Sequence, residues 1–283
     1  MNSQFPYTLE QAVSWLREQP DQQDLVYHCY YDDPLESAAE RFSNSEEWKA
    51  IKYLLRKQVP GKVLDIGAGR GIVSYAFAKA GCSVTALEPD PSSLVGAKAI
   101  QDLVNKTNLP IEIVQEYGET LPFQDNYFDV VYARAVLHHA QDLKQFCKEA
   151  ARVLRRGGVF LAAREHVISR KEDLQLFLDS HALHSLYGEE NAYLLQEYTE
   201  AIRSAGLNLQ KVMGHYESVI NYAPMTQQEF QSMTTSMLTH FRIGTKLSSW
   251  LASQEFVQEF YGWHLSKKLD TPGRHFSFLA FKN

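Results

Sequence analysis

The chain has 283 residues, 45% of them hydrophobic and 22% charged, and it carries a formal net charge of -6 at pH 7. This length and composition fit one large globular α/β enzyme domain with additions. The acidic balance argues against broad binding of nucleic acid or of an anionic membrane, because both normally require a basic surface.

The cysteines and the N-terminus bear on location. Cys29, Cys82 and Cys147 are dispersed without metal-ligand spacing, which indicates a reducing compartment rather than a disulfide framework. The first 19 residues are polar and lack the apolar core of a signal peptide, and no apolar run approaches 18 residues. We therefore expect a cytoplasmic protein.

In chain order, the first elements are helical segments rich in aromatic residues, interrupted by Pro34. We interpret residues 1–45 as an N-terminal helical cap and residues 46–283 as the main domain. In the main domain, apolar runs alternate with amphipathic stretches in the β-α-β order of a parallel sheet. The predicted strands are residues 62–66, 83–87, 111–115, 128–132 and 158–163. The predicted helices are residues 70–80, 91–105, 141–154 and 194–205.

The most informative segment is the sequence VLDIGAGRG at residues 63–71, an apolar strand that runs into three glycines at alternate positions. Glycines at a strand-to-helix turn allow backbone conformations that other residues avoid, and they let a ligand lie against the main chain. Asp65 places a carboxylate beside this turn. Glu88 ends the second strand about twenty residues later, where a carboxylate suits the hydroxyls of a ribose.

Two other interpretations of this loop were weighed. A purely structural turn would require Asp65, the three glycines and Glu88 to coincide by chance. A dinucleotide site requires the spacing G-x-G-x-x-G/A, but Ile72 stands in place of the third small residue, and Asp65 would repel a diphosphate. The loop therefore favours a ligand with a ribose and a cationic or zwitterionic end.

These residues resemble the first motif of the class I S-adenosylmethionine-dependent methyltransferases, and downstream segments extend the resemblance. Residues 86–90, ALEPD, are similar to the acidic end of that family's second strand. Residues 119–123, ETLPF, followed by residues 126–131, resemble the "LPF…FDVV" stretch of its small-molecule branch. Residues 152–158, RVLRRGG, are similar to the turn before its fifth strand. Together the motifs are specific for the superfamily but not for a substrate.

The resemblance implies an α/β fold with a Rossmann-like, seven-stranded methyltransferase sheet, mostly parallel and closed by an antiparallel terminal hairpin. We expect residues 207–220 and 275–281 to form that hairpin. Insertions at about 167–193 and 224–270 depart from the minimal fold, and the second has helical periodicity. Because ligands bind at the carboxyl ends of parallel strands, we expect the N-terminal segment and the insertions to form a helical lid there. The covering role of the second insertion depends on its topology.

The resemblance also implies S-adenosylmethionine as the cofactor. Asp65 would receive its ammonium, Glu88 would hold its ribose, and the glycines would pass beneath it. Tyr117 stands where the family commonly has an aspartate near adenine, so it either stacks or is purely structural. The residues expected at the cofactor are Asp65, Gly67, Ala68, Gly69, Gly71, Glu88, Pro89, Tyr117, Gly118 and Ala133.

The acceptor side is predicted from position. His166 follows the fifth predicted strand and His184 lies in the insertion after it, so both are candidate catalytic residues, with a plain hydrogen-bonding role as the alternative. Arg134 follows the fourth strand and either binds an anionic group of the substrate or forms a salt bridge. His138, in an "LHH" string, either packs or contacts substrate. The residues expected at the substrate are Arg134, His138, His181 and Tyr187.

A metal site was considered for the same region. His181 and His184, together with Glu165 or Glu190, have suitable side chains, but the sequence has no recognised ligand signature. We therefore assign no metal ligands.

The sequence thus predicts a cytoplasmic enzyme that transfers a methyl group from S-adenosylmethionine to a small organic molecule by in-line displacement. We expect no nucleic-acid or membrane partner, and a monomer or homodimer. The alternatives are an RNA or protein methyltransferase and a catalytically silent regulator that binds the cofactor. The acidic charge weakens the first, and the intact Asp65, Glu88 and glycines weaken the second.

Overall fold

The computed structural model describes residues 7–180, 183–188, 190–241 and 244–283. The α-helices are α1 (Leu9–Arg17), α2 (Gln23–His28), α3 (Leu35–Asn44), α4 (Glu46–Leu54), α5 (Ile72–Lys79), α6 (Ala97–Thr107), α7 (Leu143–Val153), α8 (Leu174–Asp179), α9 (His184–Tyr187), α10 (Leu195–Ser204), α11 (Val219–Tyr222), α12 (Gln227–His240), α13 (Thr245–Ala252) and α14 (Glu255–Lys268). Short 3₁₀ turns are η1 (Pro20–Gln22), η2 (Leu137–His139), η3 (Lys171–Asp173) and η4 (His215–Glu217). The strands are β1 (Lys62–Ile66), β2 (Ser83–Leu87), β3 (Ile111–Val114), β4 (Phe128–Arg134), β5 (Leu154–Ile168), β6 (Tyr193–Leu194), β7 (Leu207–Met213) and β8 (Arg274–Lys282).

A mostly parallel sheet forms the centre of the molecule, with the strand order β3-β2-β1-β4-β5-β8-β7. β1 to β5 pair in parallel, β8 pairs antiparallel with both β5 and β7, and the short β6 adds to the end of β5. The predicted seven-stranded sheet with its antiparallel hairpin is confirmed, with β6 as an addition.

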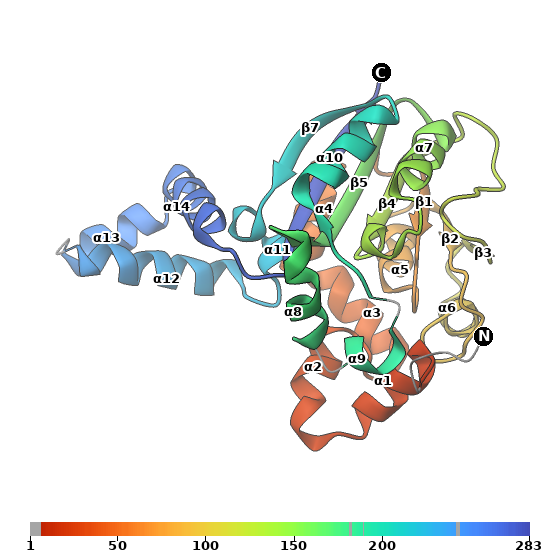
Figure 1. Cartoon of the computed structure of the whole chain (residues 1–283), viewed down its shortest axis with the longest axis horizontal. Helices are drawn as coiled ribbons and strands as arrows, with labels where there is room; N and C mark the ends of the chain where they lie inside the picture. The colour runs from red at the N-terminus through yellow and green to blue at the C-terminus, as the bar shows by residue number, and fades with distance from the viewer. Residues whose placement is uncertain (1–6, 181–182, 189, 242–243) are drawn as a thin grey trace.

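The apolar side chains of the strands alternate between the two faces of the sheet, as the two-residue period of a strand requires. On β4, Val130 and Tyr132 belong to the hydrophobic core beneath α3, α4, α5 and α6. Val131 and Ala133 belong to the opposite core, which α7 and α10 cover. Helices therefore cover both faces (Figure 1), as expected for parallel strands buried on both sides.

The ends of two strands, β5 and β7, differ most from the sequence prediction. β5 continues to Ile168, so Glu165 and His166 lie within a strand rather than after one. They follow a register shift between Ala162 and Glu165 and pair with Phe276 and His275 of β8. The irregularity lies at Arg164, whose φ of 58° interrupts regular strand geometry.

β7 ends at Met213, whereas the predicted strand extends to residue 220. The chain turns here because the Asn221 side-chain amide donates to the carbonyls of Met213 and Gly214, at 2.8 and 2.9 Å. Ser218 then caps α11. These side chains satisfy the backbone groups that a continued strand would have paired.

The N-terminal helices form two groups. α3 packs on α5, and its Phe42 lies in the same core as Trp48 and Phe77. α1 and α2 instead form a small separate cluster in which Ala12, Leu16 and Val26 contact Leu183 of the first insertion. We call α1, η1, α2 and the described residues of 174–193 the cap; it lies across one edge of the sheet (Figure 1). The domain boundary at residue 45 stays a prediction.

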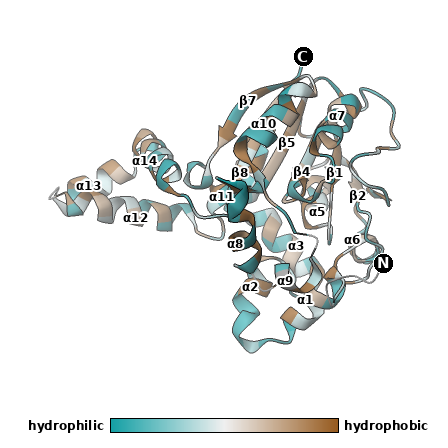
Figure 2. Cartoon of the chain, in the orientation of Figure 1, coloured by the Kyte–Doolittle hydropathy of each residue, from teal (hydrophilic) through white to brown (hydrophobic). Residues whose placement is uncertain are grey.

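The second insertion is helical, as its periodicity predicts, but it does not lie over the cap. Its helices α12, α13 and α14 project away from the sheet as an arm (Figure 1). The base of the arm packs through Phe230 and Leu265 against Val219 and Tyr222. Brown segments along the arm mark hydrophobic residues in this part of the ribbon (Figure 2). Exposed large residues there are Phe241, Leu247, Trp250, Phe256, Phe260 and Trp263.

Among the described residues, none of the helices combines the length and apolar character needed to cross a bilayer.

Candidate cofactor and acceptor site

The glycine loop joins β1 to α5 at the carboxyl edge of the sheet. Gly67, Gly69 and Gly71 have φ values of 65°, 55° and 80°, a region that side chains strongly disfavour. A Cβ on Gly67 would lie 2.5 Å from the Val136 side chain, whereas one on Gly69 would meet nothing closer than 3.9 Å. Gly67 is therefore required for packing, and Gly69 leaves the main chain open toward a ligand. The N–H groups of Gly67 and Ala68 both donate to the carbonyl of Leu87 and fix the loop to β2.

Glu88 lies directly beside this loop. One of its carboxylate oxygens accepts a 2.7 Å hydrogen bond from the Gly69 N–H, and the other accepts from Asp90 N at 3.0 Å. Burial raises the pKa of Glu88 to about 7, although these two hydrogen bonds oppose the shift. The acidic residue at the end of the second strand and the middle glycine of the loop are thus in direct contact.

Asp65 is buried beneath the loop at the end of β1. The Ser74 hydroxyl of α5 donates to its carboxylate at 2.6 Å. Burial raises the pKa of Asp65 to about 7, and the nearby Glu88 carboxylate adds to that effect. Within the described ranges of the chain, neither carboxyl group forms an ion pair with a basic side chain. A bound ammonium would therefore stabilise the two carboxyl groups under this loop.

Arg70, between the second and third glycines, was not singled out from the sequence. Its buried guanidinium donates to the carbonyls of Tyr30 and Asp32 and to the Asp33 carboxylate, at 2.8, 2.9 and 2.6 Å. The loop is therefore tied directly to the chain that follows α2. The sequence shows only that an arginine lies inside the glycine loop, and this position does not indicate which residues it contacts.

The cap makes a second contact near the same loop. One Glu10 oxygen accepts from the backbone N–H groups of Ser93 and Leu94, at 3.0 and 2.9 Å. The cap therefore holds the chain after β2 as well as the loop after β1. This supports the expectation that the N-terminal segment covers the carboxyl edge.

The remaining predicted cofactor residues differ in their surroundings. Ala133 is fully buried between Ile66 and Ala162 in the sheet. Gly118 packs so closely on Phe146 that a Cβ would lie 2.2 Å from the ring. Tyr117 is 63% exposed, so its ring does not pack against the core. Pro89, next to Glu88, is half-buried.

Arg134, at the end of β4, is already partnered. Its guanidinium forms a bidentate ion pair with the buried Glu47 of α4, with N–O distances of 2.7 and 3.0 Å. Burial alone would lower the pKa of Arg134, but the Glu47 charge raises it. The geometry matches the salt-bridge alternative, and an anionic substrate would have to compete with Glu47.

Histidines and carboxylates gather where β4 and β5 end. His138 lies between two glutamates: its Nδ1 is 2.8 Å from Glu165 and its Nε2 is 3.0 Å from Glu190. Glu165, which is completely buried, also accepts from the backbone N–H groups of Val136 and His138. Burial would lower the pKa of His138, but the two glutamates raise it to about 9. The ring is therefore protonated at neutral pH when no other cation is bound.

His166 and His184 lie in the same cluster, with ring centroids 6.3 Å apart. His166 Nδ1 is 2.8 Å from the carbonyl of Gly273, which places its proton on Nδ1. Burial, with the nearby His138 charge, lowers the pKa of His166 to about 3. Burial likewise lowers the pKa of His184, whose Nε2 is 3.6 Å from Glu190. The structure thus brings these two predicted residues together as neutral rings.

Of the other two substrate candidates, Tyr187 is partly buried and its hydroxyl donates to Glu190 at 2.5 Å. His181 lies outside the described residues. The sequence indicates Glu190 only as an alternative to Glu165 beside two candidate histidine ligands. In the structure, both His138 and Tyr187 contact its carboxylate. Burial opposes its ionisation, but the neighbouring histidines lower the pKa of Glu190 below its ordinary value.

A cavity of about 520 Å³ lies beside the glycine loop, lined by Pro34, Arg70, Leu94, Asp102 and Lys106 among others. Neither Asp65 nor Glu88 lines it. The cofactor site is therefore located from the loop and its carboxylates rather than from this cavity.

Residues 64–162 match the protein family described as "Methyltransferase domain". The chain is 29% identical to the ubiquinone biosynthesis O-methyltransferase of Methylobacterium sp. (strain 4-46) over 51% of its own length and 59% of that protein. It is 32% identical to the sarcosine/dimethylglycine N-methyltransferase of Halorhodospira halochloris over 53% of its own length and 51% of that protein. The chain thus spans between half and three fifths of the length of these curated relatives.

Solved structures resemble almost the whole chain at low identity. A candidate sarcosine dimethylglycine methyltransferase from Galdieria sulphuraria superposes with a TM-score of 0.59 at 18% identity, over 96% of this chain and 98% of that one. The geranyl diphosphate C-methyltransferase of Streptomyces coelicolor A3(2) gives 0.57 at 14% identity, over 98% and 100%. At these low sequence identities, the structural similarity shows a shared fold.

Proposed function

We propose that this chain, whose residues 64–162 form a domain of the methyltransferase family, transfers a methyl group from S-adenosylmethionine to a small organic acceptor. The observation that carries the proposal is the contact between Glu88 and Gly69, with Asp65 buried beneath the same loop. S-adenosylmethionine supplies a methyl group on a sulfonium. The acceptor's lone pair forms the bond to that carbon as the carbon–sulfur bond breaks, and its electrons pass to sulfur.

The residues of the loop fit this cofactor in charge and shape. Glu88 would bind the ribose hydroxyls with the carboxylate that now accepts from Gly69 and Asp90. Asp65 would bind the ammonium, directly or through water, and this cation would offset the cost of burying its charge. Gly69 has no side chain to keep the ligand from the backbone.

The chain's own contribution to the reaction is to position the acceptor and to exclude water, which are the main requirements of an in-line displacement. The cap is placed for this role, because its Glu10 bonds the chain after β2, and Arg70 ties the segment that directly follows α2 to the loop after β1. His166 and His184 remain our candidates for the acceptor side. Because the pKa of His166 is lowered to about 3, its free Nε2 is a weak base, so we assign the ring to positioning rather than to proton abstraction.

We further propose a cytoplasmic location, a small-molecule acceptor, no nucleic-acid or membrane partner, and a monomeric or homodimeric state. The sequences of small-molecule O- and N-methyltransferases among the relatives support the acceptor class. The net charge of -6 supports the absence of a nucleic-acid partner.

Calorimetry tests the cofactor assignment. The chain should bind S-adenosylmethionine and S-adenosylhomocysteine with dissociation constants below about 1 mM, and NAD more weakly. Tighter binding of NAD would contradict the assignment. Turnover against a panel of small-molecule acceptors then tests the activity, because binding without turnover on any acceptor would favour a silent cofactor-binding regulator.

Hydrogen exchange tests the role of the cap. Binding of S-adenosylhomocysteine should slow exchange in residues 7–33 and in the described part of 174–193, since the cap must open to admit the ligand and then close over it. The arm, residues 227–268, is the internal control and should not change. Equal protection of the cap with and without ligand would leave it as a fixed wall.

A further inference from the structure

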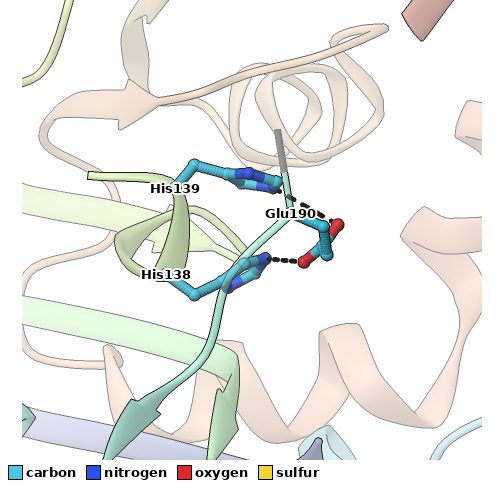
Figure 3. A group of neighbouring side chains, drawn as sticks. All are labelled: His138, His139 and Glu190. Atoms are coloured by element: carbon cyan, nitrogen blue, oxygen red, sulfur yellow. Dashed lines mark ion pairs between the residues drawn. The ribbon is translucent and has the colours of Figure 1, made fainter. Parts of the chain in front are cut away.

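Three side chains with metal-binding atoms meet at the end of β4. His138 and His139 belong to the turn η2, and Glu190 belongs to the first insertion, more than fifty positions later. Both imidazole rings point toward the Glu190 carboxylate (Figure 3). Two separate segments of the chain therefore present ligands to one point.

The distances suit a single small cation. Nε2 of His138 is 3.0 Å from Oε1 of Glu190, and Nε2 of His139 is 4.0 Å from Oε2. The three ligand atoms all lie within 4.8 Å of one another. Two ligands of one zinc ion, each at about 2.0–2.1 Å, are about 3.4 Å apart in a tetrahedral site. A rotation of His139, which is 37% exposed, would close the remaining gap.

A second shell of hydrogen bonds is already in place. Glu165 accepts from Nδ1 of His138 at 2.8 Å, which directs Nε2 of the same ring toward Glu190. Tyr187 donates to the other Glu190 oxygen at 2.5 Å. Metal-bound histidines characteristically donate their second ring nitrogen to a carboxylate, and metal-bound carboxylates are themselves hydrogen-bonded.

The contact of Glu190 with His138 is an ion pair without a well-aligned hydrogen bond. Oε1 of Glu190 is buried and has no aligned hydrogen-bond donor, although Nε2 of His138 lies 3.0 Å away. The side chain of Glu190 is only 6% exposed, so water does not readily satisfy this oxygen. An atom of this kind is costly unless a cation completes its coordination.

We propose that Nε2 of His138, Nε2 of His139 and the Glu190 carboxylate bind one divalent transition-metal ion of the zinc type, with a fourth position open. Two imidazoles and a carboxylate favour zinc and its neighbours over magnesium or calcium, which prefer oxygen ligands alone. The ion joins the cap to the turn after β4 and so stabilises the closed form of the cap. From the sequence we assign no metal ligands, because it has no recognised ligand signature; the group considered there, His181 and His184 with Glu165 or Glu190, includes neither His138 nor His139.

The test is zinc binding by the untagged, chelator-treated full chain, measured by competition with a chromophoric chelator. We expect one Zn²⁺ ion per chain with a dissociation constant below about 1 μM. His139→Ala and Glu190→Gln should each weaken binding by at least about tenfold, and Glu165→Gln by about 10- to 100-fold through loss of the second shell. Co²⁺ in place of Zn²⁺ should give visible absorption bands that disappear in His139→Ala.

The matched control is His240→Ala, which removes an exposed histidine at the end of α12, far from the cluster. It should bind zinc as the unmodified chain does. Binding weaker than about 100 μM, or binding lost in His240→Ala and kept in His139→Ala, would overturn the proposal and leave His138 as a protonated bridge between two glutamates. Circular dichroism and thermal unfolding without metal establish that each variant is folded. Because His139 is partly exposed, its variant decides the question if Glu190→Gln is unstable.

Discussion

Two pairs of buried carboxylates stand at the carboxyl edge of the sheet, and their surroundings are opposite. Among the described residues, the hydrogen-bond donors to Asp65 and Glu88 are a hydroxyl and backbone N–H groups, and burial raises both of their pKa values to about 7. Glu165 and Glu190 have His138 between them, and the pKa of Glu190 is lowered despite its burial. Without ligand, no basic side chain among the described residues forms an ion pair with Asp65 or Glu88, whereas the protonated His138 lies between Glu165 and Glu190.

This difference indicates what each pair is for. A carboxylate buried without a cation costs stability, and that cost is recovered when a positively charged ligand binds. A carboxylate paired with histidine instead holds two segments of the chain together. We therefore interpret Asp65 and Glu88 as the proposed binding site for a cationic ligand. Glu165 and Glu190, with His138 between them, instead connect the first insertion to the sheet.

The largest expected effect is on stability when the charged partner of the second pair is removed. His138→Ala leaves Glu165 and Glu190 buried without their shared cation, and breaking a buried pair in this way costs about 3–5 kcal/mol. The free energy of unfolding from urea titrations at pH 7, in chelator-treated protein, should fall by that amount. His215→Ala, which removes a ring that burial keeps neutral, is the control and should cost less. Equal losses would show that cavity formation, not charge, dominates.

The next effect is on cofactor affinity. Asp65→Ala removes a charge-assisted contact to the ammonium and should weaken S-adenosylhomocysteine binding by about 1.5–3 kcal/mol, or about 10- to 150-fold in calorimetry. Asp102→Asn is the matched control, because Asp102 lines the 520 Å³ cavity beside the loop rather than the loop itself. If Asp102→Asn loses more affinity than Asp65→Ala, the ligand occupies that cavity instead.

The pH dependence of stability tests the raised pKa of Asp65 without ligand, and its sign is the same as that expected from the raised pKa of His138. The pKa of Asp65 is raised from 3.8 to about 7, so the folded chain holds more protons than the unfolded chain between these values. Stability therefore falls as pH rises through this window, and the loss is complete above pH 7. Three pKa units correspond to at most about 4 kcal/mol. Asp65→Asn should accordingly raise the free energy of unfolding at pH 8, with little change at pH 4.

Ligand binding supplies an independent check of the same shift. A bound ammonium favours ionised Asp65, so S-adenosylhomocysteine should release close to one proton from this group at pH 6. Calorimetry in buffers with different ionisation enthalpies measures that release. Proton uptake, or no proton exchange in the unmodified chain, would contradict the raised pKa.

The sequence predicts the glycine loop and its two carboxylates well, because the residues that indicate them are close together in the sequence. Asp65, the glycines and Glu88 lie at the ends of two neighbouring strands whose apolar pattern is regular, and parallel pairing brings those ends together. The ends of β5 and β7 are predicted less well. The bulge at Arg164 and the turn held by Asn221 both depend on side chains that meet only in the folded chain.

The contacts around His138 and Arg134 could not be predicted from the sequence, because they also depend on how distant segments fold together. His138 and Glu190 meet only because the first insertion folds back onto η2, and Arg134 meets Glu47 across 87 positions of sequence. Neither pairing has a spacing signature. The arm of α12 to α14 adds a further case, since helical periodicity predicts its helices but not the direction in which they project.

The smallest expected effect concerns His166, which lies beside the second pair without a charge of its own. Because its pKa is about 3 and its Nδ1 proton is held by Gly273, the ring is neutral throughout the range in which an enzyme of this kind is assayed. His166→Asn should therefore raise KM for the acceptor by less than about tenfold and leave kcat nearly unchanged, as expected when binding rather than proton transfer is lost. The pH profile of kcat between pH 6 and 9 should keep its shape. A fall in kcat of about 10²-fold or more, with an ionisation that disappears in the variant, would instead make His166 the general base and require a conformation in which the ring is solvated.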